Sequence, residues 1–278
     1  MFNKISVIRK IGENVPRDFV TAQADIIHAF GQKNNIPVFD TSEKTTLPSD
    51  AKKVLFVSLG GDGTMLHAAK QSLKYSKSTV VGFNFGHLGF LTNGSCSVKK
   101  TLYDIKNHNM KCDSRMIIEA SGNETKAIAM NEFLFAPASV HNMNTTRVFI
   151  NDELVIKYRG SGVLVSTSTG STAMAVSAGG PIISPNTNVM LIVPILAHSL
   201  SSHPIITSGR DHIAVKINAD EDLEVSADGQ STQLGKFAKG VHRRNNIISI
   251  QRYGKDVHIW RTKEWQFFKT LSTKMGWK

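Results

Sequence analysis

Cysteine is scarce in this sequence, since only Cys96 and Cys112 occur among its 278 residues. Two thiols are too few for a disulfide framework, and neither stands at metal-ligand spacing from another cysteine or a histidine. We therefore interpret both as unreactive thiols of a protein that works in a reducing compartment. No dedicated metal site is predicted.

Long hydrophobic runs are absent as well. The longest apolar run, Val189 to Ala197, is too short to cross a bilayer and contains Pro194. The amino terminus, Met1 to Gly12, is a short alternating segment without a small-residue cleavage signal. These absences argue against secretion and against a membrane partner, and the expected location is the cytoplasm.

Several catalytic signatures are missing too. The chain has no GxxxxGK[ST] phosphate loop, and it lacks the glycine-rich loop, catalytic loop and DFG segment of protein kinases. It also has no HExxH and no GxSxG segment, which removes the common hydrolase classes. If the protein is a kinase, it belongs to a different class.

Positive charge, by contrast, is in excess, with a formal net charge of +11. The segment from Lys236 to the end holds eleven Lys and Arg against two acids, a net charge of +9. These basic residues interleave with strand-like and aromatic positions, and no nucleic-acid-binding module is recognisable among them. We interpret the segment as a solvated face that also favours a phosphate-rich substrate, and we expect no nucleic acid partner.

The first part of the chain alternates between strand and helix patterns. The apolar periodicity predicts strand 4–9, helix 16–33, strand 53–59, helix 64–74 and strand 79–83, in that order. Strands separated by helices of this length pair in parallel. Residues 1–109 are therefore predicted to form an α/β domain with an open parallel sheet, whose ligands bind beyond the carboxyl ends of the strands.

From residue 110 the pattern changes to many short β-rich runs separated by turn residues. Residues 110–260 are predicted to form a mainly antiparallel β domain, with a hairpin turn at Asn151-Asp152 and one helix near 171–178. The helical pattern of 263–274 predicts that the last segment, 261–278, packs back on the first domain.

The strongest local signal is the turn Gly60-Gly61-Asp62-Gly63-Thr64, which stands between an apolar strand and a helix. Its glycines permit close backbone approach to a ligand, and the free N–H groups at the helix start favour phosphate. A carboxylate beside phosphates is repulsive, so Asp62 is expected to accept a hydroxyl proton or to hold a divalent cation. The alternative is that Asp62 only caps the helix.

GGDGT and the segments that follow it resemble the NAD kinase family in order and spacing. The matching segments are GFNFGHLGFL at 82–91, AMNEFLF at 129–135, GVLVSTSTGSTAMAVSAGGP at 162–181, PILAHSL at 194–200 and DGQ at 228–230. GGDGT alone is shared with diacylglycerol and sphingosine kinases and, more distantly, with phosphofructokinases, whereas the combination is specific. The resemblance covers nearly the whole chain. It implies an α/β domain, a β domain and an NAD site between them, often at a homo-oligomer interface.

By this resemblance the enzyme transfers a phosphoryl group from ATP or polyphosphate to the adenosine-ribose 2′-hydroxyl of NAD, giving NADP. Asp62 would accept the hydroxyl proton, and Asn131 with Glu132 would hydrogen-bond the ribose or a nicotinamide-side group. The other residues assigned to substrate or nucleotide binding are Gly61, Gly63, Phe90, Leu91, Arg159, Ser161, Thr169, Thr172, Ala173, Met174, Ser177, Leu196 and Gln230. The resemblance also implies a divalent cation, Mg²⁺, with ATP and a homodimer or homotetramer.

Several of these residues also have a plain structural interpretation. Phe90 and Leu91 could be core residues, and the hydroxyls around Thr169 could be caps and turn formers. Asn131 and Glu132 differ, because they interrupt an apolar strand and an unpaired buried charge is costly. Function is therefore the preferred interpretation for that pair.

Two positions depart from the family pattern. Ser161 replaces an aspartate of the family in the stretch Arg159-Gly160-Ser161-Gly162, and Met174 replaces the tyrosine that follows STA. The first change loses a charged acceptor and the second loses an aromatic stacking face. We expect weaker NAD binding than is usual in the family, with the chemistry at Asp62 retained.

Two other functions remain open on sequence grounds. A lipid kinase of the diacylglycerol or sphingosine type would follow GGDGT with a GTGND-like segment, and Phe83 to Leu91 stands in that place instead. A catalytically weak NAD-binding protein is conceivable because Ser161 and Met174 are altered. The retained Asp62 and the Asn131-Glu132 pair argue against it.

Overall fold

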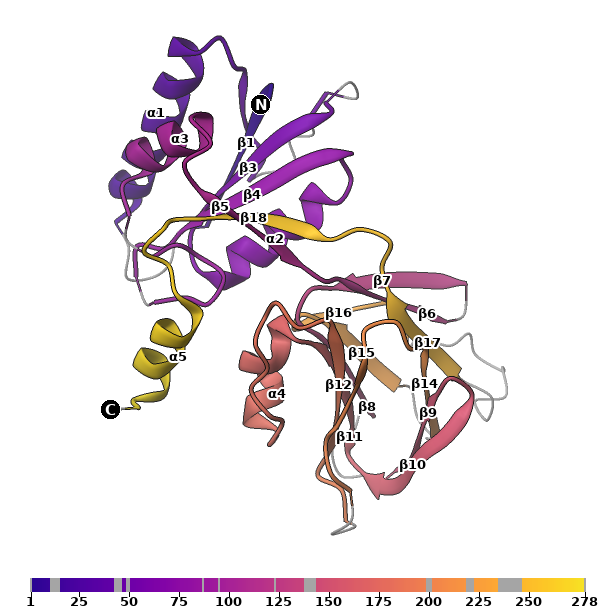
Figure 1. Ribbon diagram of the computed structural model, residues 1–278. Helices are drawn as coiled ribbons and strands as arrows, with labels where there is room; N and C mark the ends of the chain where they lie inside the picture. The colour runs from indigo at the N-terminus through magenta and orange to yellow at the C-terminus, as the bar shows by residue number, and fades with distance from the viewer. Residues whose placement is uncertain are drawn as a thin grey trace. The chain divides into compact units, whose positions relative to one another are not determined.

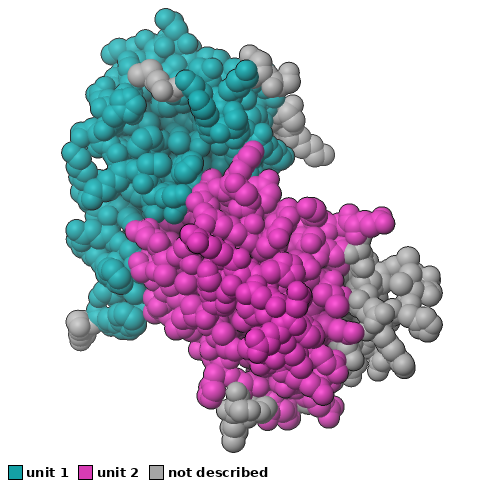
Figure 2. All heavy atoms as spheres, turned by 45° about the vertical axis from the view of Figure 1, so that its right-hand side comes forward, with its two compact units in different colours: residues 1–114, 257–278 teal, residues 115–256 magenta. Residues whose placement is uncertain are grey.

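The computed structural model describes residues 2–10, 16–42, 47–48, 51–86, 88–94, 96–122, 124–137, 144–198, 202–218, 223–234 and 247–277. The chain divides into two compact units, which are coloured separately in Figure 2. Unit 1 comprises Met1–Ser114 with Val257–Lys278, and unit 2 comprises Arg115–Asp256. Each unit has a hydrophobic core of its own.

Unit 1 is built on a mostly parallel sheet. Its described strands are, in spatial order, β2 (Val38–Asp40), β1 (Lys4–Arg9), β3 (Lys53–Leu59), β4 (Lys77–Phe83), β18 (Val257–Arg261) and β5 (Lys111–Arg115). β1 pairs in parallel with β2 and β3, and β4 pairs in parallel with β3 and β18. The carboxyl ends of β3 and β4 therefore meet at one edge of the sheet.

Helices cover both faces of this sheet (Figure 1). The helices of unit 1 are α1 (Arg17–Lys33), α2 (Asp62–Ser72), α3 (Val98–Lys106) and α5 (Phe267–Met275). Val81 and Phe83 of β4 belong to the core that α1 and α3 complete on one face. Between them Gly82 points the other way, where a Cβ would come within 2.7 Å of Met65 Sδ. Because side chains alternate along a strand, α2 lies on the opposite face.

Unit 2 consists of two sheets, in which the described strands pair antiparallel. The first contains, in spatial order, β10 (Glu153–Gly160), β9 (Asn144–Ile150), β14 (Ile213–Asn218), β17 (Ile247–Arg252), β6 (Ile118–Gly122) and β7 (Thr125–Ala129). The second contains β13 (Ile205–Ser208), β12 (Val189–Ile195), β11 (Gly162–Thr167), β8 (Glu132–Pro137), β15 (Leu223–Ala227) and β16 (Gln230–Ser231).

Alternation along the strands of unit 2 explains its packing. Val163 and Val165 of β11 join Val148 of the other sheet in one core cluster. Leu164 points away from that core and packs against Ala175 of the short helix α4 (Met174–Ser177). β11 is therefore buried on both faces, which explains its unbroken apolar sequence.

The predicted fold class, an α/β amino-terminal domain with an open parallel sheet plus a mainly antiparallel β carboxy-terminal domain, is confirmed. Two strands join a different sheet from the one that the sequence pattern indicated. β5 and all of β18 except Arg261 fall inside the interval 110–260, yet both strands belong to the sheet of unit 1, where Ile259 pairs with Val80. Alternation predicts that a segment is a strand but does not identify its neighbour, which tertiary packing selects.

Local predictions agree with the structure in two places and differ in a third. Asn151 and Asp152 have φ values of 49° and 68°, as a type I′ hairpin requires, and they connect β9 to β10. The expected final helix is α5. The helix expected near 171–178 is instead a 3₁₀ turn, η1 (Thr169–Thr172), followed by α4. Among the described residues no helix is long and apolar enough to cross a membrane.

Candidate functional site

Asp62 lies at the edge of the unit 1 sheet from which the loops after β3 and β4 leave side by side. It is the first residue of α2 and follows β3 after Gly60 and Gly61, the second of which is the N-cap of that helix. The last residue of β3, Leu59, pairs with the last residue of β4, Phe83. The GGDGT turn and the segment that follows β4 therefore leave the sheet at the same edge, which is the usual ligand edge of a parallel sheet.

Both carboxylate oxygens of Asp62 accept hydrogen bonds from that second segment. The backbone N–H of Phe90 donates to Oδ2 at 2.7 Å, and the N–H of Leu91 donates to Oδ1 at 3.0 Å. Two bonds to two oxygens fix the plane of the carboxylate as well as its position. The Asp62 side chain is therefore bound to the loop 88–92, and helix capping does not account for these two hydrogen bonds.

Glycine makes this close approach possible. A Cβ at Gly89 would lie 2.1 Å from Asp62 Oδ1 and 2.6 Å from Thr92 Oγ1, so any larger residue would displace the carboxylate. Gly61 and Gly63 differ, because a Cβ at either would have no atom within 4 Å. Bare backbone therefore flanks Asp62 on both sides in the chain, as phosphate or ribose binding requires.

Phe90 and Leu91, which were predicted to line the pocket, contribute their backbone to the site. Leu91 is buried, and Phe90 is half-buried with its ring centroid 6.2 Å from that of Phe267 and 4.9 Å from the ammonium of Lys274. Their side chains pack within unit 1, while their N–H groups orient Asp62. The core interpretation therefore accounts for the buried Leu91 side chain, while the backbone N–H groups of both residues bind the Asp62 carboxylate.

In unit 2, Asn131 and Glu132 are held by a second carboxylate. Asp228 Oδ1 accepts the N–H of Asn131 at 2.7 Å and that of Glu132 at 3.2 Å, and its Oδ2 accepts the N–H of Met130 at 3.1 Å. The N–H of Asp228 donates to the Glu132 carbonyl at 3.0 Å. Glu132 is buried, and Asn131 is half-buried at the start of β8.

Asp228 was noted in the sequence only as part of a matching segment, and it was not assigned a role. Its signal was the Asp228-Gly229 dipeptide, a turn sequence in which both residues adopt positive φ, 52° and 73°. Such a turn at the end of β15 returns the aspartate to the neighbouring strand β8. The spatial partner of this aspartate is not encoded in the dipeptide itself.

The hydroxyl-rich segment 166–172 lies against the same residues. Thr167 Oγ1 donates to the Met130 carbonyl at 2.6 Å, and Ser166 Oγ donates to the Asn131 carbonyl at 3.0 Å. Thr169 Oγ1 accepts a hydrogen bond from the guanidinium of Arg115 at 3.3 Å. Within the segment, Ser171 Oγ donates to the Ser168 carbonyl at 2.8 Å and Thr172 Oγ1 to the Thr169 carbonyl at 3.4 Å, so these two hydroxyls form turns, as the structural interpretation anticipated.

The predicted residues of unit 2 fall into two groups at opposite ends of β11. One group is near the carboxyl end of β11 and comprises Asn131, Glu132, Thr169 and Thr172, with Ala173, Met174 and Ser177 following in η1 and α4 and Gln230 after the Asp228 turn. The other group, Arg159, Ser161 and Leu196, lies at the amino end. There the N–H of Ser161 donates to the Ile195 carbonyl at 3.0 Å.

Exposure separates these residues further. Arg159, Ser177 and Gln230 are exposed, and Leu196 and Met174 are exposed apolar side chains with 76% and 39% of their surface accessible. Thr169 is buried, and the remaining residues of both groups are half-buried or buried. Exposed apolar side chains on a turn and on a short helix are suited to contact with a flat aromatic ligand or a neighbouring subunit.

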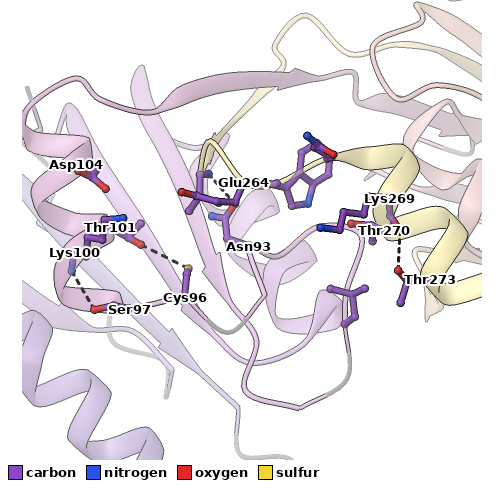
Figure 3. Close-up of a pocket in the computed structure, with 14 residues that line it drawn as sticks. Asn93, Cys96, Ser97, Lys100, Thr101, Asp104, Glu264, Lys269, Thr270 and Thr273 are labelled. Carbon is purple, nitrogen blue, oxygen red and sulfur yellow. Dashed lines mark hydrogen bonds between the residues drawn. The ribbon is translucent and has the colours of Figure 1, made fainter.

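Unit 1 also contains a cavity of about 500 Å³ between α3 and the segment that leads into α5 (Figure 3). Its lining includes Leu88, Asn93, Lys100, Glu264 and Lys269, and none of the predicted site residues. Cys96 also lines it, and burial raises the pKa of this thiol. Partial burial and the charge of Asp113 likewise raise the pKa of the Cys112 thiol. Both observations fit unreactive thiols at neutral pH.

Within the described residues no group of three or more His, Cys, Asp or Glu side chains is arranged to hold a metal ion. Mg²⁺ commonly binds through one or two carboxylates together with the phosphates of its substrate. Within the GGDGT turn the one carboxylate is that of Asp62, which already accepts two backbone amides. These residues do not form a complete Mg²⁺ site without ligands from a bound nucleotide.

Family models match most of the chain. The model described as the ATP-NAD kinase N-terminal domain matches residues 8–109, and the ATP-NAD kinase C-terminal domain matches residues 130–243. The chain is similar to the NAD kinase of Coxiella burnetii, with 31% identity over 100% of this chain and 95% of the relative. It is 33% identical to the NAD kinase of Francisella tularensis subsp. novicida over 99% of this chain and 97% of the relative.

Solved structures share the fold. A crystal structure of yeast NADH kinase complexed with NADH superposes with a TM-score of 0.82 at 21% identity, covering 100% of this chain and 88% of that one. An NAD kinase from Archaeoglobus fulgidus in complex with ATP superposes with a TM-score of 0.73 at 21% identity, covering 98% and 97%. At this identity the likeness concerns the fold.

Proposed function

The chain belongs to the NAD kinase family and is a kinase that phosphorylates NAD, and we propose that Asp62 is the group that accepts the proton of the acceptor hydroxyl. The hydroxyl in question is the 2′-hydroxyl of the adenosine ribose, and the product is NADP. The observation that carries this proposal is the carboxylate of Asp62, held through both oxygens by the N–H groups of Phe90 and Leu91.

A carboxylate in this setting suits general-base catalysis. Each oxygen has a second lone-pair direction beyond the one that the amide occupies, so a hydroxyl can still donate to it. The two backbone bonds hold the oxygen in one place, and phosphoryl transfer depends mainly on such alignment of nucleophile and donor. As the ribose oxygen bonds to the transferred phosphorus and the bond to the leaving group breaks, the hydroxyl proton passes to Asp62.

The lipid-kinase alternative is not retained. The matching family models are those of ATP-NAD kinases, and they cover segments in both units. The residues 83–91 that stand in place of a GTGND-like segment also supply the amides that hold Asp62. A protein that only bound NAD would have no use for an Asp62 carboxylate held in one orientation by two amides.

The phosphoryl donor and its cation are part of the proposal. We propose ATP as the principal donor, with polyphosphate as a second donor to be tested, and a divalent cation, Mg²⁺, that arrives bound to the nucleotide phosphates. Such a cation neutralises charge on the transferred group. Because no metal-ligand cluster occurs among the described residues, no step of the reaction is assigned to a protein-held ion.

The residues near the carboxyl end of β11 are proposed to bind NAD. Asn131 and Glu132 bring an amide and a carboxylate that suit the hydroxyls of a ribose, and the Asp228 contact keeps both residues in register. Thr172, Ala173, Met174, Ser177 and Gln230 are proposed to line the nucleotide from the adjoining turn, helix and strand. The location of the protein is proposed to be the cytoplasm, and fractionation of cells with an antibody to the chain would test this.

We further propose a homodimer or homotetramer. Arg159, Ser161 and Leu196 are separated from Asn131 by the length of β11, about 20 Å for six residues of strand. This separation supports an assembly in which the Arg159 group contacts NAD bound by a neighbouring subunit. Mixed oligomers of Asp62→Asn and Arg159→Ala protomers should then be more active than either variant alone, whereas a monomer in sedimentation with no such gain would contradict the assembly.

The reaction is tested directly by NADP⁺ formation from NAD⁺, ATP and Mg²⁺, read through an NADP⁺-specific dehydrogenase. The wild-type chain should form NADP⁺, and Asp62→Asn should lower kcat on the order of 10²–10⁴-fold, because general-base catalysis typically contributes that much. A control that leaves the site untouched is Asp211→Asn, a half-buried acid of unit 2 whose pKa is lowered mainly by hydrogen bonds from Thr207 and Asn151. Full activity of Asp62→Asn would exclude it as the base.

A further inference from the structure

Arg261, the last residue of β18, binds the loop 88–92, whose backbone N–H groups bind Asp62. It is 2% exposed, and its Nη1 donates to the Leu91 carbonyl at 2.6 Å. The same Nη1 lies 3.5 Å from the Thr92 carbonyl, and Nη2 donates to the Phe90 carbonyl at 3.4 Å. One guanidinium thus engages three consecutive carbonyls of the loop.

The two sets of contacts meet on a single peptide group. The amide between Phe90 and Leu91 points its carbonyl oxygen toward Arg261 and its N–H toward Asp62 Oδ1. A cation on the carbonyl polarises the amide, so its N–H becomes a better donor to the carboxylate. The path from Arg261 to Asp62 therefore passes through one rigid, planar unit.

Arg261 is itself fixed from two other directions. Its Nε lies 3.2 Å from Asp113 Oδ2, with both side chains nearly buried, and its guanidinium stacks 4.0 Å from the ring centroid of Trp265. A guanidinium buried in this way keeps one orientation, because all three of its nitrogens donate hydrogen bonds and one flat face stacks on Trp265. Lysine could supply the charge but neither the planar fork nor the stacking.

A weaker contact supports the same loop from α5. The ammonium of Lys274 donates to the Leu88 carbonyl at 2.8 Å and lies over the ring of Phe90. Lys274 is exposed, so it contributes less than Arg261 does, and its removal does not threaten the core. Both cations come from the carboxy-terminal segment of the chain, far in sequence from the loop.

We infer that Arg261 is a positioning residue for phosphoryl transfer, which sets the orientation of the Asp62 carboxylate through the loop 88–92 without touching the substrate. This inference rests on the proposed role of Asp62 as the proton acceptor. Loss of the guanidinium releases the loop carbonyls, the Phe90 and Leu91 amides turn, and the carboxylate loses alignment while remaining in the site.

The experiment compares Arg261→Met, Arg261→Lys and a matched control, Arg252→Met, in the purified full chain. Arg252 is an exposed arginine of unit 2 that pairs with Asp256 at 2.8 Å, so it offers the same chemical change away from the site. Steady-state kcat and KM for NAD⁺ are measured with each melting temperature. Arg261→Met and Arg252→Met are also made in the Asp62→Asn background.

Arg261→Met should lower kcat by about 30- to 100-fold with KM for NAD⁺ within about threefold of wild type, because a displacement of about 1 Å can reduce a rate 10²-fold. Arg261→Lys should recover part of this loss, and Arg252→Met should change nothing. In the Asp62→Asn background, Arg261→Met should lower the residual rate by less than about threefold, since its effect passes through the absent carboxylate.

Other outcomes separate the two claims. If the wild-type chain forms no NADP⁺, the proposed function fails and this inference fails with it. If the wild type is active but Arg261→Met keeps its kcat, or loses as much again in the Asp62→Asn background, only the inference is overturned. If Arg261→Met does not fold, Lys274→Met takes its place. Its kcat should fall by about threefold at unchanged KM. An unchanged kcat in both Lys274→Met and Arg261→Lys overturns the inference.

Discussion

Each unit holds one aspartate carboxylate through backbone amides, and the surroundings of the two carboxylates differ. In unit 1, Asp62 accepts the N–H groups of two consecutive residues, and in unit 2, Asp228 accepts those of three. Around Asp62, bare glycines leave the carboxylate as the chemical group on offer. Around Asp228, the residues that donate the amides, Asn131 and Glu132, carry the candidate ligand groups themselves.

The comparison teaches that a carboxylate held by backbone amides is not by itself a sign of catalysis. In unit 1 the backbone of loop 88–92 fixes the carboxylate of Asp62, and in unit 2 the carboxylate of Asp228 fixes the start of β8. What distinguishes the two is the surroundings: a parallel-sheet edge with a helix start near Asp62, and an antiparallel strand end near Asp228. Variants that alter each contact in the same way therefore test this difference.

The largest difference is expected from two glycines. Gly89→Ala brings a Cβ to 2.1 Å from Asp62 Oδ1, and Gly170→Ala brings one to 2.3 Å from the Asn131 carbonyl. Displacement of the base should lower kcat on the order of 10²-fold in Gly89→Ala. Gly170→Ala should mainly raise KM for NAD⁺, by about tenfold.

Steady-state kinetics of both glycine variants check this prediction, with Gly254→Ala as control, since a Cβ at Gly254 would have no atom within 4 Å. A fall in kcat of equal size in Gly89→Ala and Gly170→Ala would contradict the proposal that Asp62 acts in the chemical step and Asn131 in NAD binding. Loss of folding in either variant is detected by circular dichroism before the kinetics are compared.

Asp228→Asn should produce an intermediate effect. The substitution keeps one oxygen and turns a side-chain amide nitrogen toward the third backbone N–H, which leaves a buried donor without an acceptor at a cost of about 1–3 kcal/mol. The melting temperature should fall on the order of 5 °C. KM for NAD⁺ should rise by about five- to tenfold while kcat changes little, because Asn131 and Glu132 move and Asp62 does not.

Calorimetry and steady-state kinetics on the same Asp228→Asn sample check both halves of this prediction. A strongly reduced kcat at unchanged KM would assign Asp228 a part in the chemistry. An unchanged melting temperature would show that the three amide contacts contribute little to unit 2.

The smallest effects are expected at the two departures from the family pattern. Ser161→Asp restores a charged acceptor, and Met174→Tyr restores an aromatic face on an exposed position. An aromatic contact is worth about 0.5–1.5 kcal/mol, so Met174→Tyr should tighten NAD⁺ binding by about two- to tenfold with kcat retained. A hydrogen bond to a charged group is worth at least about 1.5 kcal/mol, so Ser161→Asp should tighten it by about tenfold. Titration calorimetry with NAD⁺ measures this, and weaker binding in both variants would reverse our interpretation of these positions.

Sequence reasoning was effective where the signal is local. Strand and helix periodicity predicted the fold class, and the Asn151-Asp152 dipeptide predicted its hairpin. GGDGT after an apolar strand led to Asp62 because strand, turn and helix start are contiguous in the chain. The candidate residues of unit 2 followed from family resemblance rather than from spacing.

What the sequence did not reveal are contacts between distant segments. Arg261 reaches Leu91 across 170 positions, and Asp228 reaches Asn131 across 97. Neither residue stands out by composition, since an arginine ending a strand and an aspartate in a turn are ordinary. Their roles arise from the pairing of β18 with β4 and of β15 with β8, and such pairings depend on the whole packed sheet.

The most direct test of the central claim is the single-turnover rate of NADP⁺ formation, measured by rapid quench at saturating NAD⁺ and ATP, for Asp62→Asn beside Asp228→Asn. Each substitution replaces one carboxylate oxygen that accepts a backbone amide, so the loss of that contact is matched. We predict a rate on the order of 10²-fold or more below wild type for Asp62→Asn and within about threefold of wild type for Asp228→Asn. Equal rates in the two variants would contradict the assignment of Asp62 as the proton acceptor.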